Sequence, residues 1–475
     1  MKNYILSILL CCTLSLVAQK KEKDIIHQLE AKTSFYDGIA KTIWANPELG
    51  YLEEKSSALL QKTLSDEGFK IQVGVAEIPT AFVAEYGSGA PVIAILAEFD
   101  ALPGISQKAQ TTKEPIVEGG AGHACGHHLF GTASTAAGIA VKDWLKQTGT
   151  KGTVRVYGTP AEEGGAGKVY MARAGLLNDV DAVLHWHPGN QNSASATSTL
   201  ANKSAKFRFY GEASHAAGAP WRGRSALDGV EAMNYMTNLL REHVPPETRI
   251  HYVITRGGEA PNVVPAFAEV FYYVRNPEAA NVKSIFEKVV KAAEGAAMGT
   301  HTEMDYEVIH GLYNILPNET LARVMYKNLK EVGGVVYNEE ETKFGEEILA
   351  TYPGVNASLV SANQIQDFIV REKGSGGSTD VGDVSWLVPT AGLSTATWVP
   401  GTMAHTWQAV AAGGTSIGTK GMMVAAKTLT LTAIDIFENP ELTGKALEEL
   451  KRRRGEGFIY EALLGDRKPP LDYRK

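Results

Sequence analysis

The chain has 475 residues, which is too long for one ordinary domain, so we expect two domains or one domain with a large insertion. Its 44% hydrophobic and 21% charged residues are typical of a soluble globular protein with a sizeable core. A net charge of -7 without any Lys/Arg-rich run argues against a nucleic-acid-binding protein.

The first residues have the pattern of a secretory signal peptide. Lys2 precedes an apolar run over 4–17, and a polar stretch follows the small residue Ala18. We expect cleavage near Ala18, so that residues 1–18 are a signal peptide, and we expect export with the periplasm as destination. A membrane anchor is disfavoured because the run falls short of the ~20 apolar residues that a span needs.

The three cysteines carry further information. Cys11 and Cys12 lie in the apolar run and leave a lipoprotein as an alternative, although the residues before them are not the usual small ones. Removal of the signal peptide leaves Cys125 as the only cysteine, so no intrachain disulfide can form. A lone thiol in an oxidising compartment is a liability unless it is buried or bound to metal.

Further along the chain, strands alternate with helices. A helical pattern over 25–69 is broken at Asn46-Pro47. Strands are then predicted at 91–99, 153–157, 181–186 and 391–398, with helices at 129–145 and near 168–174. This alternation predicts an α/β domain with a mostly parallel sheet covered by helices on both faces. Sites gather at the carboxyl ends of such strands, which here carry Asp100, Glu162, Glu163 and His187.

Residues 200–312 have a different pattern of expected strands and helices, which predicts an inserted α+β module. Strands are expected at 203–210, 251–255, 268–275 and 302–309, and helices at 226–242 and 279–294. The order β-α-β-β-α-β is that of a self-sufficient, ferredoxin-like unit. We therefore expect a catalytic domain in two parts, 19–199 and 314–475, separated by a module over 200–313. The Gly/Ser-rich segment 372–379 predicts a flexible loop near the site.

The segment Gly122-His123-Ala124-Cys125-Gly126-His127-His128 carries the most specific chemistry. Residues two apart in an extended stretch project to the same side, so Cys125 and His127 can reach one centre. A thiolate and an imidazole are good ligands for zinc and neighbouring transition metals. Taken alone, the pattern fits side-chain packing as well as it fits metal binding.

Three further segments add to it. Glu162 and Glu163 are adjacent carboxylates among glycines, so one can bind metal while the other acts as general base, although such pairs are usually surface pairs. His185 and His187 lie on one face of an apolar strand, and we favour His187 as a ligand because it stands at the strand end. His405 follows a later strand in a loop, and by itself it is better explained as a structural histidine.

Together these segments resemble a known enzyme family. The runs GHACGHH, PAEEGG, HWHPG, SHAAGAPWRGRSA, APNVVP, GSTDVGDVSW and MAHTWQ resemble, in this order, the co-catalytic metallopeptidases of the aminoacylase/carboxypeptidase type. Within them the chain is most similar to the amidohydrolase branch, which includes indole-acetyl-amino-acid hydrolases and the B-type subunits of p-aminobenzoyl-glutamate hydrolase. The resemblance covers essentially the whole chain after the predicted signal peptide.

The resemblance implies a site with two divalent metal ions, Mn or Zn. Cys125 would bridge them in place of the bridging Asp of the wider family, and Glu162 would be the general base. The remaining ligands would be His127, Glu163, His187 and His405. The implied reaction is hydrolysis of the amide bond of an N-acyl or N-aroyl amino acid such as p-aminobenzoyl-glutamate.

The resemblance also gives roles to the inserted module. The module would mediate homodimerisation, so that His215 reaches the site of a partner chain and stabilises the tetrahedral oxyanion, a role that suits an imidazole donor. Asn262 and Arg275 match positions that hold the substrate carboxylate, where the fork of Arg fits such a group. A salt bridge at a strand end would explain Arg275 equally well.

Two positions depart from the pattern of the relatives. Glu98 and Asp100 stand where the wider family has His-x-Asp, so a histidine ligand is absent and Asp100 is expected to orient a ligand from outside the ligand set. His128 follows His127 where near relatives carry Asn or Asp, and it stays unassigned.

Several alternatives remain open at this point. Cys125 with a nearby histidine would also suit a thiol hydrolase. A dipeptidase or aminoacylase of the same fold, or an exported protein that only binds acylated amino acids, would share the pattern. The two paired kinds of subunit in the family leave a paralogous partner chain as a further possibility, and no membrane span is expected once the signal peptide is removed.

Overall fold

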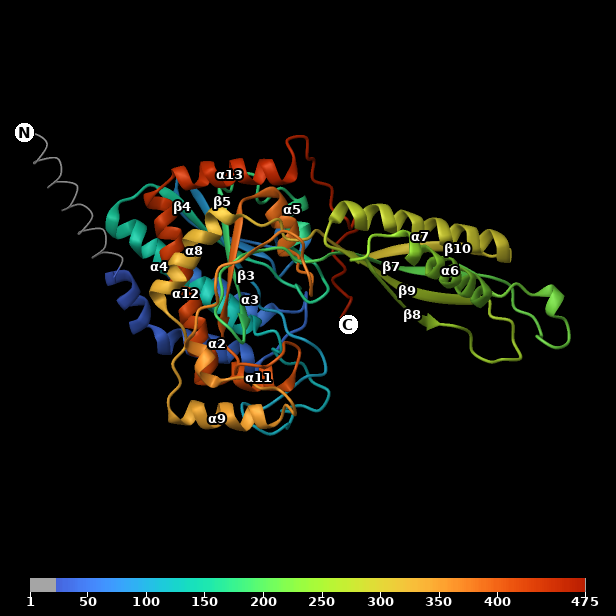
Figure 1. Ribbon diagram of the computed structural model, residues 1–475, viewed down its shortest axis with the longest axis horizontal. Coiled ribbons are helices and arrows are strands. Elements are labelled where there is room, and N and C mark those ends of the chain that lie inside the picture. The colour runs from blue at the N-terminus through green and yellow to red at the C-terminus, as the bar shows by residue number, and fades with distance from the viewer. Residues whose placement is uncertain (1–22, 475) are drawn as a thin grey trace, which may run out of the picture.

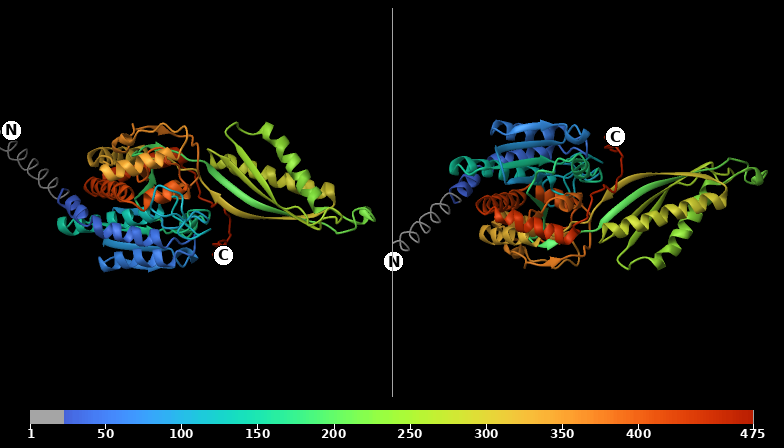
Figure 2. Two further views of the ribbon diagram at one scale, coloured as in Figure 1. Left: turned by 90° about the horizontal axis from the view of Figure 1, so that it is seen from below. Right: turned by 90° about the horizontal axis from the view of Figure 1, so that it is seen from above.

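The computed structural model describes residues 23–474. The predicted signal peptide, with Cys11 and Cys12, lies outside the described residues. The described chain forms a large domain and a module that projects from one side of it (Figures 1 and 2). Among residues 23–474, no helix combines the length and the apolar character needed to cross a bilayer.

The large domain is built on one six-stranded sheet with the strand order β1-β2-β4-β3-β5-β12. The strands are β1 (Lys70–Val73), β2 (Phe82–Ser88), β3 (Val92–Ala97), β4 (Gly152–Gly158), β5 (Ala182–Gly189) and β12 (Thr390–Ala396). The last four in sequence are mutually parallel, whereas β1 pairs antiparallel with β2 and β2 antiparallel with β4. The prediction of a mostly parallel sheet is confirmed, and β2 is the strand of this sheet that runs against the others, so both of its pairings are antiparallel.

Helices cover both faces of this sheet. Side chains of β3 alternate: Ile93 and Ile95 enter one hydrophobic core, and Ala94 and Leu96 enter the other. The first core is closed by α2 (Thr33–Ala45), α3 (Glu54–Asp66), α4 (His127–Thr148), α8 (Glu319–Val332) and α12 (Ser416–Glu438). The second core is closed by α5 (Gly167–Arg173) and α10 (Val381–Leu387). The central strand β3 is therefore apolar on both sides, as a buried parallel strand requires.

The inserted module has its own sheet, in the order β10-β7-β9-β8, with all neighbours antiparallel. Along the chain it runs β7 (Ala201–Tyr210), α6 (Ala226–Leu240), β8 (Arg249–Arg256), β9 (Phe267–Asn276), α7 (Ala279–Thr300) and β10 (Glu303–Leu312). This is the β-α-β-β-α-β order predicted from the sequence. Both helices pack on the sheet around a core that includes Phe207, Val270 and Val289.

The parallel strands place several loops at one edge of the large domain. The turn after β3 carries Glu98 and Asp100, the loop after β4 carries Glu162 and Glu163, and β5 ends beyond His187. Between β12 and α11 (Trp407–Gly413) lies the loop with His405. The segment 372–379 has neither helix nor strand; it follows β11 (Val370–Arg371) and leads into Asp380, just before α10.

Candidate metal centre

All five predicted ligands meet at this edge. In three groups of side chains the ligand atoms all lie within 4.8 Å of one another: Cys125, His127 and His187; Cys125, Glu163 and His405; and Glu98, His127 and Glu162. Cys125 belongs to the first two groups, so its sulfur stands between two sets of donors. The arrangement thus offers two neighbouring ion positions that share one thiolate.

Cys125 and His187 form the inner part of the site. Cys125 is a buried free cysteine whose Sγ lies 3.4 Å from Nε2 of His187. Nδ1 of His187 donates to the carbonyl of Pro188 at 2.7 Å, so Nε2 keeps its lone pair toward the thiol. Burial lowers the pKa of His187 to about 4. Burial raises the pKa of Cys125, and the negative charge of Glu163 raises it further. His187 is therefore neutral near pH 7 with Nε2 able to act as a ligand, and the Cys125 thiol could become one once it loses its proton.

His127 is the first residue of α4 and is completely buried. Its Nδ1 lies 2.8 Å from Oδ1 of Asp100, which can only accept, so Nδ1 donates and Nε2 has the lone pair. Nε2 in turn lies 3.1 Å from Oε2 of Glu98. Two acceptors at this distance repel one another unless a proton or a cation lies between them. Burial opposes protonation of His127, yet the negative charges around the ring outweigh it and raise its pKa.

Glu163 and His405 come from different loops and pair at 3.2 Å between Oε1 and Nε2. Burial opposes the ionisation of Glu163, but the hydrogen bond from His405 and the charge of His127 outweigh burial and lower its pKa to about 2. His405 has a left-handed backbone, with φ 62°, and its N–H donates to the carbonyl of Ala124 at 3.0 Å. This hydrogen bond fixes the loop to the segment that contains Cys125. It also explains the left-handed conformation, which non-glycine residues adopt only when their surroundings hold them in it.

Glu162 stands next to Glu163 with its side chain half-buried. Burial raises its pKa well above the ordinary value, and the charges of Glu98 and Glu163 add to the effect. A hydrogen bond holds the loop after β4 in place, because the N–H of Ala161 donates to Oε1 of Glu53 at 2.8 Å. Ala161 has a left-handed backbone, with φ 58°. A fixed carboxylate with a raised pKa beside the donor cluster suits proton transfer.

The unpaired atoms at this site fit a metal ion. Nε2 of His127 and Oε2 of Glu98 are buried and have no hydrogen-bond partner. Leaving such atoms unsatisfied is costly, and a divalent cation would satisfy both at once. The mixture of thiolate, imidazole and carboxylate donors suits zinc and neighbouring transition metals.

Behind the donors lies a buried ion network that the sequence did not reveal. Nζ of Lys168 lies 2.6 Å from Oε1 of Glu98 and 2.7 Å from Oδ1 of Asp380. Burial disfavours the charged lysine, but the charges of Asp380 and Glu98 outweigh it and raise its pKa. Lys168 thus holds the Glu98 carboxylate against His127. The only signal in the sequence is a single lysine at the start of a short helix.

Two predicted residues of the module, His215 and Asn262, lie together but away from this centre. The carbonyl of Asn262 accepts from the N–H of Ala216 at 3.0 Å, which joins the loops after β7 and β8. The loop 211–225 lies at the far end of the module from the large domain (Figures 1 and 2). Nδ1 of His215 accepts from the N–H of Gly218 at 2.9 Å, so its Nε2–H is free to donate.

Arg275 lies at the opposite end of the module, near the large domain, because it pairs in register with Asn202 at the start of β7. Its Nε is buried and without a hydrogen-bond partner. Its guanidinium lies 5.4 Å from the ring centre of Tyr273, and among residues 23–474 no ion pair joins it to a carboxylate. An unpaired guanidinium at this position favours the substrate-carboxylate interpretation over the structural salt bridge.

Other histidines near the centre have structural contacts. Nε2 of His128 donates to the carbonyl of Gly413 at 3.0 Å, and burial lowers the pKa of His128 to about 3. His185 packs against Gly392 of β12, where an added Cβ would lie 2.2 Å from the ring Nε2. Neither histidine belongs to the three donor groups.

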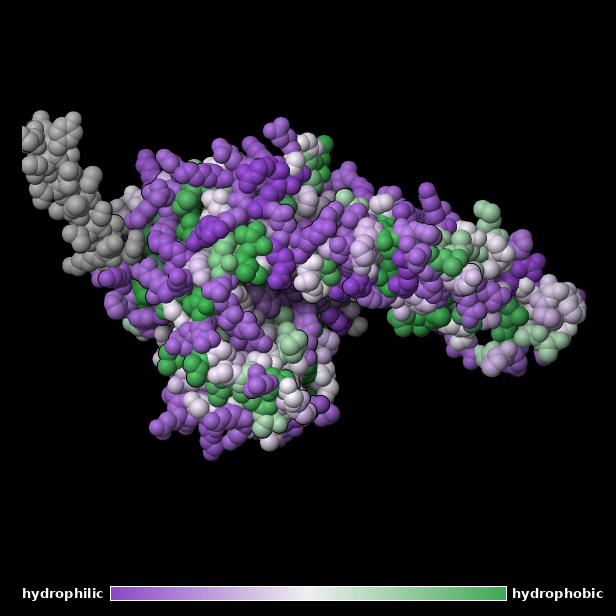
Figure 3. All heavy atoms as spheres, in the orientation of Figure 1, coloured by the Kyte–Doolittle hydropathy of each residue, from purple (hydrophilic) through white to green (hydrophobic). Residues whose placement is uncertain are grey.

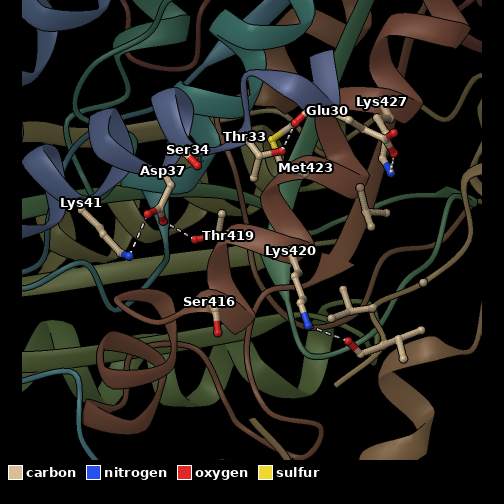
Figure 4. A pocket seen from close by; sticks show the side chains of 14 residues that line it. Glu30, Thr33, Ser34, Asp37, Lys41, Ser416, Thr419, Lys420, Met423 and Lys427 are labelled. Atoms are coloured by element: carbon tan, nitrogen blue, oxygen red, sulfur yellow. Dashed lines mark hydrogen bonds and ion pairs between the residues drawn. The ribbon is translucent and has the colours of Figure 1, made fainter. Parts of the chain in front are cut away.

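A separate cavity of about 610 Å³ lies away from the metal centre, between α2 and α12 (Figure 4). Two of its lysines are engaged by neighbouring acids: Lys41 by Asp37 at 2.8 Å and Lys427 by Glu30 at 2.9 Å. Met423 contributes apolar surface. With these charges internally paired, the cavity is a weak candidate for binding a charged ligand.

Comparisons with known proteins identify the family of this chain. Residues 94–406 match Peptidase family M20/M25/M40. The chain is 43% identical over 446 residues to the B-type subunit of the p-aminobenzoyl-glutamate hydrolase of Escherichia coli (strain K12), a match that covers 89% of this chain and 93% of that protein. It is 31% identical over 428 residues to the Xaa-Arg dipeptidase of Mus musculus, a match that covers 87% and 88%.

A solved structure shares the fold. It is a Bacillus subtilis protein described as a dinuclear metal binding peptidase from the M20 family, with a TM-score of 0.59 and 19% sequence identity. The match covers 86% of this chain and 99% of that one. The likeness extends over both the large domain and the module, which confirms the predicted fold class.

Proposed function

Since this chain belongs to Peptidase family M20/M25/M40, whose members hydrolyse amide bonds, we propose that it cleaves the amide bond of an N-aroyl or N-acyl amino acid. The observation that carries the proposal is the convergence of five proposed metal ligands with Glu162 at the carboxyl edge of the parallel sheet. The relative named as a p-aminobenzoyl-glutamate hydrolase makes p-aminobenzoyl-glutamate the first candidate substrate.

The proposed cofactor is a pair of divalent ions, Mn or Zn. Cys125 would bridge the two positions, and the other ligands would be His127, Glu163, His187 and His405. Such a pair, when bound, polarises an amide carbonyl and lowers the pKa of a nearby water. Asp100 and Glu98 would orient His127 from behind, and Lys168 would hold Glu98.

The residues of the chain supply proton transfer and positioning. Glu162 accepts a proton from the attacking water and later delivers one to the leaving amide nitrogen. The free guanidinium of Arg275, together with Asn262 from a second copy of the chain, holds the carboxylate of the substrate. His215 donates its free Nε2–H to the oxyanion that forms at the amide carbon.

We place His215 and Asn262 in the site of a second copy of the chain. Both lie at the far end of the module, so the centre of the same chain is out of their reach, whereas a homodimer brings them to the partner. A hydrophobic surface is available on the module: Tyr235 and Leu239 on α6 and Val253 on β8 are 68%, 57% and 56% exposed. Hydrophobic residues along the edge where β8 runs are visible in Figure 3.

Two further assignments complete the proposal. The apolar run over 4–17 supports export through a cleaved signal peptide, with the periplasm as destination. The relatives include both kinds of subunit of the Escherichia coli p-aminobenzoyl-glutamate hydrolase, the B-type and the A-type. This pairing supports a paralogous partner chain as an alternative to the homodimer.

A direct test is hydrolysis of p-aminobenzoyl-glutamate and a panel of N-acyl amino acids by metal-free protein, before and after separate loading with Mn and Zn. We expect turnover of at least one conjugate, restored by metal and abolished by chelation. Measurable binding of conjugates to metal-loaded protein without turnover would contradict the proposal and favour a binding protein.

A second candidate function is that of a dipeptidase, which the similarity to Xaa-Arg dipeptidase favours. Dipeptides ending in arginine therefore belong in the same panel, and preference for them over N-aroyl amino acids would decide for this candidate. Alkylation of Cys125 separates both from a thiol hydrolase, because metal-loaded enzyme should resist alkylation and lose activity only on chelation.

A further inference from the structure

The segment after α13 (Glu441–Arg454) connects the inserted module with the metal centre. Residues 455–474, here called the strap, contain neither helix nor strand. In Figures 1 and 2 the strap, drawn in red, leaves α13 and runs between the large domain and the module. A segment without regular structure needs side-chain and backbone contacts to hold it, and the strap has many.

Two consecutive leucines anchor the strap in both domains. Leu463 belongs to the hydrophobic core of the module, and Leu464 belongs to the core of the large domain that α5 and α10 close. Gly311 of β10 allows the close approach, because a Cβ there would lie 2.7 Å from the carbonyl carbon of Leu463. The strap is thereby held at the junction of the domains.

Hydrogen bonds continue the attachment toward the metal centre. Arg173 of α5 donates to the carbonyls of Gly465 and Arg467, at 2.7 and 2.8 Å. Arg467 in turn donates to the carbonyl of Ile309 in β10 at 2.7 Å and pairs with Glu307 at 2.9 Å. The strap is thus tied to a helix of the large domain and to a strand of the module at one point.

The last two described residues of the strap contact the backbone of Glu163. The hydroxyl of Tyr473 and the guanidinium of Arg474 both donate to the Glu163 carbonyl, at 3.2 and 2.7 Å. The Tyr473 ring packs edge-on against Tyr51, with ring centres 5.6 Å apart. Gly50 leaves the room for it, because a Cβ there would lie 2.2 Å from the Tyr473 hydroxyl. Together these contacts hold Tyr473 and Arg474 in defined positions.

The backbone of Glu163 is consequently held at both its N–H and its carbonyl. Its N–H donates to Oδ2 of Asp100 at 2.8 Å, and its carbonyl accepts from Tyr473 and Arg474. We propose that Tyr473 and Arg474 are positioning residues, which fix the backbone of Glu163 so that the Glu163 carboxylate faces the proposed metal ligands and Glu162 faces the substrate. The proposal rests on the proposed roles of Glu162 and Glu163.

The test compares Tyr473→Phe/Arg474→Gln with the wild type and with a control from the same strap, Lys468→Gln. Lys468 contributes its carbonyl to the strap contacts, while its side chain is 83% exposed. Metal-free protein is titrated with Co²⁺ and followed through the thiolate-to-cobalt absorption band, which needs no substrate. We expect Co²⁺ affinity to fall about 10- to 100-fold in the double variant and to stay at the wild-type value in Lys468→Gln.

The second readout is the rate at which each variant hydrolyses a substrate from the panel. Misplacement of Glu162 should lower kcat about tenfold or more, with little change in KM, since Tyr473 and Arg474 contact Glu163 rather than the substrate-binding residues. Thermal unfolding of the metal-free proteins separates positioning from folding. If the double variant unfolds early, Tyr473→Phe alone keeps the ring packing and removes only the hydroxyl.

The outcomes for the strap and for the proposed function are distinguishable. Weakened Co²⁺ binding with a wild type that hydrolyses no conjugate would support the strap and count against the proposed function. Wild-type Co²⁺ affinity, spectrum and kcat in a folded double variant would overturn the strap proposal, whatever the substrate proves to be.

Discussion

Oδ1 of Asp100 lies 2.8 Å from Nδ1 of His127, and the other oxygen of the same carboxylate accepts the Glu163 N–H at 2.8 Å. One side chain therefore orients two proposed ligands that come from α4 and from the loop after β4. Removing its charge should disturb both.

We predict that Asp100→Asn weakens metal binding about 10- to 100-fold, because an amide has only one acceptor oxygen for two donors. Competition of the metal-free protein against a chelator of known affinity measures the effect. Asp66→Asn, on the exposed end of α3, is the matched control and should bind metal as the wild type does. Equal affinity in both variants would contradict the role of Asp100.

Metal affinity should rise with pH. Burial and the charge of Glu163 raise the pKa of Cys125, so the thiol carries its proton near pH 7 and must lose it to bind. His187, with a pKa near 4, is already neutral and releases none. The bound state therefore holds at least one proton fewer, and affinity should increase about tenfold or more per pH unit between roughly pH 6 and 8. Calorimetry in buffers of different ionisation enthalpy counts the protons, and a flat affinity would contradict the assignment.

Lys168→Met should destabilise the metal-free protein by about 3–5 kcal/mol, because it leaves Glu98 and Asp380 buried without their counter-charge. Lys62→Met removes an exposed pair with Asp66 and should cost less than about 1 kcal/mol. Denaturant unfolding gives both values. Similar losses in the two variants would show that the buried network is not what holds Glu98 in place.

Mixed dimers test whether the site is shared between two chains. His215→Ala and Glu162→Gln should each be nearly inactive alone. If His215 serves the partner's site, dimers that contain one of each have one complete site, and exchange should restore about a quarter of wild-type activity. Failure of the mixture to regain activity, with exchange confirmed by a mass tag, would place both residues in the site of one chain.

The sequence predicted the parts of the fold and site that local patterns encode. The buried strands read as apolar runs, and Cys125 and His127 stand two residues apart in a recognisable segment. At position 98 the sequence indicates only that a histidine ligand is absent, whereas the structure places Oε2 of Glu98 3.1 Å from Nε2 of His127. The roles of the ligand residues themselves stay predictions until metal binding is measured.

Contacts between distant parts of the chain could not be predicted. Lys168 and Asp380 are 212 residues apart, and Arg474 and Glu163 are 311 apart. A lone lysine in a short helix and an arginine beyond the last helix carry no periodic signal. The antiparallel pairings of β2 could not be predicted for a similar reason, since the composition of a strand does not determine the direction in which it pairs.

In the proposed function, metal ions and Glu162 together make this chain an amide hydrolase. The most direct measurement is turnover of a panel substrate by Glu162→Gln, alongside its metal content. We predict wild-type metal content with kcat lowered about 10²- to 10⁴-fold, because the ligands are intact and only the proton acceptor is lost. Full activity in Glu162→Gln at equal metal content would contradict the claim.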